Sequence, residues 1–206
     1  MQNTNHSIFI LDNTFYAQNQ DYFPGRFSCQ VEFIYSVMQK AMESHQSTMG
    51  IIPLCQPSPN YILTPTKDRK LISQFLSKFK LGENPDFMIS SKLFLSIIKK
   101  NFLTIQDQKN VNVYLFLGSP VNFVDEVINT LKEVEKTEIS LKLILFGEAV
   151  DILDKVGNEW INSKILPIKD SDGFRSIYEN QNLYGEEFED DDPSLRAALE
   201  LSKKEF

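Results

Sequence analysis

The chain has 206 residues and a formal net charge of −7, with 42% hydrophobic and 12% aromatic residues. This composition is sufficient for one domain with a large apolar core. Residues 186–206 hold eight acidic and three basic side chains, so most of the negative charge belongs to the C-terminal end. A nearly neutral domain with an acidic tail argues against a nucleic-acid partner, which requires a basic face.

Cysteine content and hydropathy narrow the class further. The two cysteines, Cys29 and Cys55, are too few for a disulfide framework and lie in no metal-binding pattern, which indicates free thiols in a reducing compartment. The polar start lacks the pattern of a signal peptide. No run approaches the roughly 18 consecutive apolar residues of a membrane span. We therefore expect a protein of the cytoplasm and nucleus without a membrane partner.

Short apolar segments alternate along the chain with segments of helical periodicity. In the first half, the pattern predicts strands at 7–11, 48–54 and 61–63, and helices at 26–44, 67–79 and 91–102. In the second half, it predicts strands at 111–117, 139–146 and 165–168, and helices at 124–134 and 152–160. The turn-forming residues 56–60 indicate a hairpin between the second and third strands. The alternation predicts an α/β fold with a doubly wound, mostly parallel sheet, one antiparallel strand and a last strand at the sheet edge.

The periodic pattern ends near residue 169, and Asp, Asn, Gln and Gly become frequent. We expect residues 1–170 to form the domain, 171–188 a flexible acidic linker, and 189–206 a detached helix. Asp192 is a good N-cap for this helix, and Pro193 suits its first position. The alternative is a C-terminal helix that packs back on the domain. The run of acidic residues before the helix argues against this alternative.

One face of the predicted C-terminal helix combines large, small and hydroxyl side chains. Leu195, Ala198, Leu199 and Ser202 share this face because they lie at helical spacing. An acidic cluster precedes them, and Glu205 follows; the cluster comprises Glu189, Asp190, Asp191 and Asp192. This arrangement resembles the ubiquitin-interacting motif, with every position of the motif filled.

The resemblance implies how the helix would bind ubiquitin. Leu195, Ala198 and Leu199 would cover an apolar patch of ubiquitin, with Ala198 at the closest approach. Ser202 would hydrogen-bond the ubiquitin backbone, and the acidic residues would face its basic rim. One short helix in a groove implies weak affinity, of the order of 10⁻⁴ M, and polyubiquitin chains would bind better through effective concentration.

The end of the first predicted strand, Asp12-Asn13-Thr14-Phe15-Tyr16, resembles the first metal-binding loop of von Willebrand factor type A domains. In the metal-binding members, an aspartate and two hydroxyls of this loop join residues of later loops around magnesium or manganese. Here Tyr16 replaces the second hydroxyl beside Thr14, and Gly118-Ser119 stands where a second aspartate belongs. The sequence therefore predicts degenerate metal-site loops that bind no metal, in which Asp12 hydrogen-bonds the adjoining loop.

With these departures, the sequence resembles one family, the ubiquitin receptors of the 19S regulatory particle of the proteasome. The similarity includes Asp12-Asn13-Thr14 with Tyr16, Asp21, Phe23-Pro24, Arg26, Leu117-Gly118-Ser119-Pro120 and Phe146-Gly147-Glu148. In that family a von Willebrand factor type A domain precedes one or more ubiquitin-interacting motifs. The resemblance implies that the domain docks on lid and base subunits and that the helix captures polyubiquitinated substrates.

No pattern predicts an enzyme or a cofactor. The sequence has no Gly-rich phosphate loop and no nucleophile elbow. Cys29 and His45 are sixteen residues apart along the predicted helix 26–44 and its end, about 24 Å, which is too far for a catalytic pair. The alternatives are a ubiquitin-binding adaptor outside the proteasome and a metal-dependent scaffold domain that binds proteins.

Overall fold

The computed structural model describes residues 5–41, 47–55, 62–82, 110–122, 124–157, 160–169 and 174. All of them belong to one compact unit, residues 1–176. The predicted helix 91–102, the turn 56–60 and the whole C-terminal helix 189–206 lie outside the described residues.

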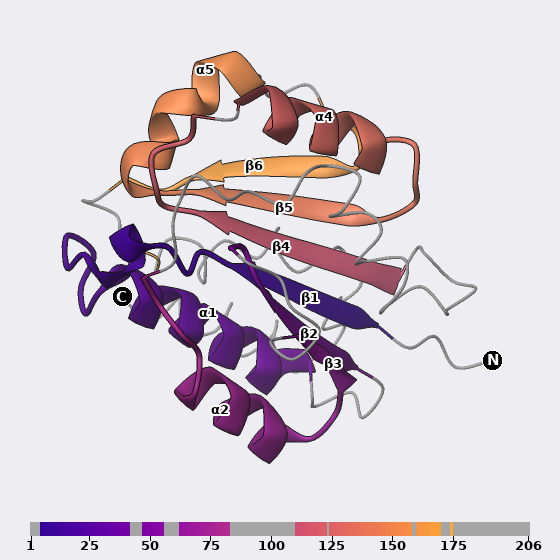
Figure 1. Cartoon of the computed structure of the whole chain (residues 1–206). Helices are drawn as coiled ribbons and strands as arrows, with labels where there is room; N and C mark the ends of the chain where they lie inside the picture. The colour runs from indigo at the N-terminus through magenta and orange to yellow at the C-terminus, as the bar shows by residue number, and fades with distance from the viewer. Residues whose placement is uncertain are drawn as a thin grey trace, which may run out of the picture. The chain divides into compact units, whose positions relative to one another are not determined.

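Six described strands form one sheet in the order β3-β2-β1-β4-β5-β6 (Figure 1). Their bounds are β1 His6–Leu11, β2 Thr48–Pro53, β3 Leu63–Thr66, β4 Val111–Leu117, β5 Ser140–Leu145 and β6 Ser163–Pro167. The β2–β3 pair is antiparallel, and the other neighbouring pairs are parallel. The predicted doubly wound, mostly parallel sheet with one antiparallel strand is confirmed.

Helices lie on both sides of this sheet. Figure 1 shows α1 and α2 on one side and α4 and α5 on the other. Their bounds are α1 Arg26–Ala41, α2 Arg69–Ser77, α4 Val124–Val134 and α5 Leu153–Val156, with 3-10 helices η1 Phe15–Gln18 and η5 Gly147–Ile152. Asp68 begins α2 as its N-cap and accepts hydrogen bonds from the backbone N–H groups of Lys70 and Leu71. None of the described helices is long and apolar enough to cross a membrane.

Alternate residues of the central strands build two cores, because successive strand side chains point to opposite faces. On one face, Ile8 and Ile10 of β1 share a buried cluster with Val127 and Leu131 of α4. On the other face, Phe33 of α1 contacts three rings, those of Phe9, Tyr114 and Phe116. Each fully buried side chain of this size contributes about 1.5–3 kcal/mol. Burial of both faces explains why β1 is apolar from Ile8 onward and why β4 has only one polar residue without an aromatic or aliphatic body, Asn112.

Two predicted elements differ from the structure. The third strand was predicted at 61–63, but β3 spans Leu63–Thr66 and includes Pro65. Proline is acceptable there because β3 is an edge strand and needs no outward N–H donor. The predicted helix 152–160 is also wrong: η5 starts this segment at Gly147, and α5 ends at Val156. Gly157, with φ of +70°, ends the helix in a backbone conformation that favours glycine.

Phe174 lies beyond the expected domain boundary at residue 170, yet it packs in the core. Its side chain is buried, and its ring centroid lies 5.8 Å from that of Tyr22 and 5.0 Å from that of Phe146. The core therefore includes one aromatic side chain from a segment without periodicity.

Candidate functional site

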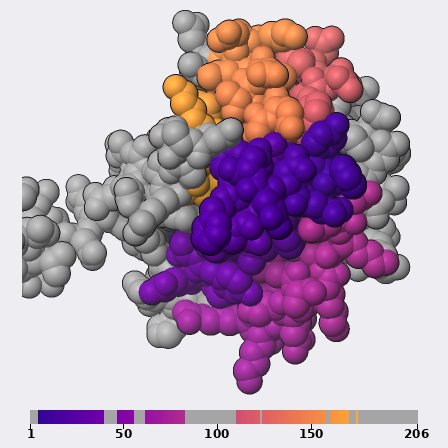
Figure 2. All heavy atoms as spheres, turned by 90° about the vertical axis from the view of Figure 1, so that its left-hand side faces the viewer, coloured from indigo at the N-terminus to yellow at the C-terminus, as the bar shows by residue number. Residues whose placement is uncertain are grey.

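From β1 the chain builds the sheet outward through β2 and β3, and from β4 it builds outward in the opposite direction through β5 and β6. The loops that follow β1 and β4 therefore leave the same edge of the sheet, at the carboxyl ends of the strands, in opposite directions. Ligand sites of open α/β sheets lie at such a switch point. Asp12 directly follows β1, and Gly118 directly follows β4. Figure 2 views the molecule from this edge, where the indigo N-terminal residues lie between orange residues above and magenta residues below.

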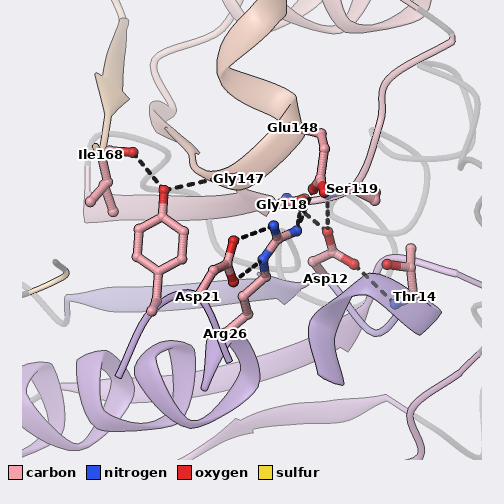
Figure 3. Close-up of polar contacts among 10 residues, drawn as sticks. Asp12, Thr14, Asp21, Arg26, Gly118, Ser119, Gly147, Glu148 and Ile168 are labelled. Carbon is pink, nitrogen blue, oxygen red and sulfur yellow. Dashed lines mark hydrogen bonds and ion pairs between the residues drawn. The ribbon is translucent and has the colours of Figure 1, made fainter. Parts of the chain in front are cut away.

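Both carboxylate oxygens of Asp12 accept backbone hydrogen bonds. Oδ1 accepts from the N–H of Thr14 at 2.9 Å, and Oδ2 accepts from the N–H groups of Gly118 and Ser119 at 2.7 and 2.9 Å (Figure 3). The Gln30 side chain exchanges two further hydrogen bonds with the Asp12 backbone. Asp12 is 1% exposed, so its carboxylate replaces water as the acceptor for these donors. It hydrogen-bonds its own loop, as expected, and also the loop after β4.

The structure brings together four of the five residues predicted in the degenerate metal-site loops, namely Asp12, Thr14, Gly118 and Ser119 (Figure 3). Tyr16 lies in η1, where it is half-buried and its ring contacts that of Phe15. The hydroxyls of Thr14 and Ser119 are buried and have no hydrogen-bond partner.

The donor set does not suit a divalent cation. The one carboxylate, Asp12, already accepts three N–H bonds, and Gly118 offers no side-chain oxygen. Magnesium and manganese require several oxygen ligands, usually including carboxylates. Among the described residues, no group of three or more His, Cys, Asp or Glu side chains could hold a metal ion. The absence of tight metal binding stays a prediction.

Arg26 joins three loops of this edge. Its Nε and Nη2 donate to both oxygens of Asp21 at 2.8 and 2.5 Å, and its Nη1 donates to the Gly118 carbonyl and to Glu148 (Figure 3). Burial opposes the charge of Arg26, but the hydrogen bonds to Asp21 and Glu148 outweigh it and raise the pKa of the guanidinium. The same hydrogen bond from Arg26 lowers the pKa of Asp21. Arg26 therefore stays charged and fixes the two carboxylates at the surface.

Two glycines allow this close packing. A Cβ at Gly118 would lie 2.1 Å from a ring carbon of Phe146. Gly147 has φ of +52°, and a Cβ there would lie 2.5 Å from the guanidinium carbon of Arg26. The Gly147 N–H donates to the Tyr22 hydroxyl, which in turn donates to the Ile168 carbonyl, both at 3.0 Å. The loops after β1, β4, β5 and β6 thus form one hydrogen-bonded layer.

Sequence reasoning missed the roles of Arg26, Asp21, Glu148 and Gln30. The family resemblance includes the first three without giving them a role, and no pattern in the sequence singles out Gln30. One usable signal existed for the first pair: a charged residue that begins a buried helix needs a partner, and Asp21 is five residues away. No comparable signal points to Glu148, which lies 122 residues from Arg26.

The residues predicted to bind ubiquitin all lie outside the described part of the chain. They are Glu189, Asp190, Asp191, Asp192, Leu195, Ala198, Leu199, Ser202 and Glu205. Their role stays a prediction from the sequence.

No protein-family model matches the chain. It is 24% identical over 174 residues to the 26S proteasome non-ATPase regulatory subunit 4 homolog of Oryza sativa, which covers 84% of this chain and 42% of that protein. It is 25% identical over 191 residues to the 26S proteasome regulatory subunit RPN10 of Saccharomyces cerevisiae, which covers 84% of this chain and 67% of that protein. The chain spans less than half the length of the first curated relatives that it matches.

Among solved structures, the VWA domain of SpRpn10 superimposes with a TM-score of 0.66 at 19% identity, covering 86% of this chain and 95% of that one. A matrix protein of the mussel byssus gives a TM-score of 0.54 at 11% identity, covering 85% and 44%. The fold is therefore that of a von Willebrand factor type A domain. In sequence, the chain is similar to regulatory subunits of the 26S proteasome.

Proposed function

We propose that this chain is a non-catalytic ubiquitin receptor of the 26S proteasome. The domain docks on lid and base subunits of the regulatory particle, and the C-terminal helix captures polyubiquitinated substrates. The observation that carries the proposal is the combination of two features in one chain. Similarity to proteasome regulatory subunits covers 84% of it, and a complete ubiquitin-interacting pattern lies at 189–206. Such a receptor would work in the cytoplasm and nucleus.

The geometry of the switch point supports a binding role rather than catalysis. Both carboxylate oxygens of Asp12 accept hydrogen bonds from backbone N–H groups. The Arg26 guanidinium donates to Asp21, Glu148 and the Gly118 carbonyl. A catalytic acid, base or nucleophile needs a free reacting atom that faces substrate. The edge at which α/β enzymes bind substrate is occupied here by side chains that stabilise the loops.

The same geometry argues against one of the two alternatives, the metal-dependent scaffold. A metal-dependent scaffold needs open carboxylate ligands, which the Asp12 contacts do not leave. A ubiquitin-binding adaptor outside the proteasome would share the helix but not the docking. Purification of the tagged full chain from its native cells separates a proteasomal receptor from such an adaptor, because only the receptor would co-purify with regulatory-particle subunits.

A ubiquitin titration followed by NMR tests the binding helix. Ala198→Gln places a long polar side chain at the proposed closest contact and should abolish binding. Ser202→Ala removes one hydrogen bond and should weaken binding by about 0.5–1.5 kcal/mol. Arg196→Ala is the control, because the proposed helix would direct Arg196 away from this face, and its loss should change little.

The opposite ranking would reject this helix face. If Ala198→Gln binds ubiquitin like the wild type while Arg196→Ala does not, the motif has been assigned wrongly.

A further inference from the structure

Phe23 is the most unusual exposed side chain at the carboxyl edge of the sheet. It is 95% exposed, although it lies between residues that are firmly held. On one side, Arg26 binds both carboxylate oxygens of Asp21. Next to it, Tyr22 is 2% exposed, and its hydroxyl bridges the Gly147 N–H and the Ile168 carbonyl.

The backbone of Phe23 is also fixed. Its carbonyl accepts a hydrogen bond from the Cys29 thiol at 3.3 Å. Burial raises the pKa of this thiol, so it stays protonated and able to donate. Single exposed apolar side chains are common and need no explanation. A phenyl ring on a loop held from both sides differs, because little conformational entropy remains to be lost when it binds.

The surroundings of Phe23 indicate the chemistry of a partner. Phe15, from the same connection between β1 and α1, is a second exposed aromatic side chain, 61% exposed. Asp21 and Glu148 share the single charge of Arg26, and their side chains are 35% and 40% exposed. Two carboxylates with one guanidinium leave a net negative charge at the surface. An aromatic side chain with an acidic border fits an apolar pocket with a basic rim.

We propose that Phe23 is the anchor through which the domain docks on the regulatory particle, entering an apolar pocket bordered by basic side chains on one of its subunits. This inference rests on the proposed function and names the part of the domain that performs the docking. Aromatic anchors in such pockets commonly dominate the energy of an interface.

The test measures binding of the full chain to purified regulatory particles that lack this subunit, by biolayer interferometry. Phe23→Ala should weaken binding on the order of tenfold or more. The matched control is Ile161→Ala, because Ile161 is also 95% exposed but lies two residues before β6, near the amino end of that strand. It should bind like the wild type. Raising the salt concentration should weaken wild-type binding, since the acidic border contributes.

The outcomes separate the inference from the proposed function. If the wild type does not bind the particle, the proposed function fails, and the inference fails with it. If the wild type binds and Phe23→Ala binds equally, only the inference is overturned. Light scattering tests whether Phe23 instead binds a second copy of this chain. If the wild type forms dimers and Phe23→Ala does not, the inference is overturned. Unchanged melting temperatures in both variants are expected, because neither side chain is buried.

Discussion

Asp12 joins the loops that follow β1 and β4 through three charged hydrogen bonds at a site 1% exposed. Asp12→Ala removes the acceptor and leaves three N–H groups without it. We expect the free energy of unfolding to fall by about 3 kcal/mol or more, measured by urea denaturation. Asp151→Ala, at an exposed position of η5, is the control and should change it little. An unchanged midpoint in Asp12→Ala would mean that Asp12 is free for another role.

Lys142 makes stability depend on pH. It is 3% exposed in β5, where Nζ donates to Asn112 at 3.0 Å and lies 4.8 Å from the centre of the Tyr114 ring. Burial, with repulsion from Lys164, lowers its pKa from 10.5 to about 8. Between these two values the unfolded chain binds more protons than the folded chain, so stability should rise with pH across this window.

Lys142→Met should remove this contribution. Urea denaturation of the wild type and the variant at about pH 7.5 and about pH 10 gives the measurement, because other titrating groups cancel in the difference. The variant's advantage over the wild type should shrink as pH rises. A difference that stays constant with pH would show that the Lys142 pKa is not lowered.

At the residue scale, the sequence predicts which site residues lie together where the parallel order of the strands alone determines their positions. Asp12, Gly118 and Ser119 could be expected to gather, because the carboxyl ends of neighbouring parallel strands meet at one edge. The partners of Arg26 could not be foreseen. Glu148 reaches Arg26 only because Gly147, with φ of +52°, lets the backbone pass within contact of the guanidinium.

The loop after β4 contacts the loop after β5 without a gap. A Cβ at Gly118 would lie 2.1 Å from the Phe146 ring, which is fully buried. Gly118→Ala should therefore lower the free energy of unfolding by about 1–3 kcal/mol. In the double variant with Phe146→Leu, which shortens the facing side chain, the loss should be smaller than the sum of the two single losses, as measured by a double-mutant cycle. Additive losses would mean that the ring moves aside freely.

Elements with strong patterns were predicted within a residue or two, and weak ones were not. β4 and α4 have the predicted bounds, because one is a continuous apolar run and the other has an apolar face with acidic residues in its first turn. The helix predicted at 152–160 differs from the segment Gly147–Val156 that the structure shows. This segment begins as a 3-10 helix, whose three-residue turn produces a different periodicity, and the α-helical part is only four residues long.

For the whole molecule, two parts of the chain would perform two tasks. The domain has a core on each face of its sheet and loops tied together at one edge, which suits a rigid docking module. The helix predicted at 189–206 would bind ubiquitin. The fold could be derived from the alternation of apolar and helical segments, whereas the proposed docking surface could not, because an exposed Phe23 leaves no periodic signal in the sequence.

A bridging assay tests the central claim most directly. Tetra-ubiquitin is immobilised, and purified regulatory particles that lack this subunit are passed over it with the full chain. Wild type should retain the particles. Ala198→Gln should retain none, although it still binds particles in solution. The account is contradicted if the wild type, bound to ubiquitin, holds no particles, or if Ala198→Gln retains as many particles as the wild type.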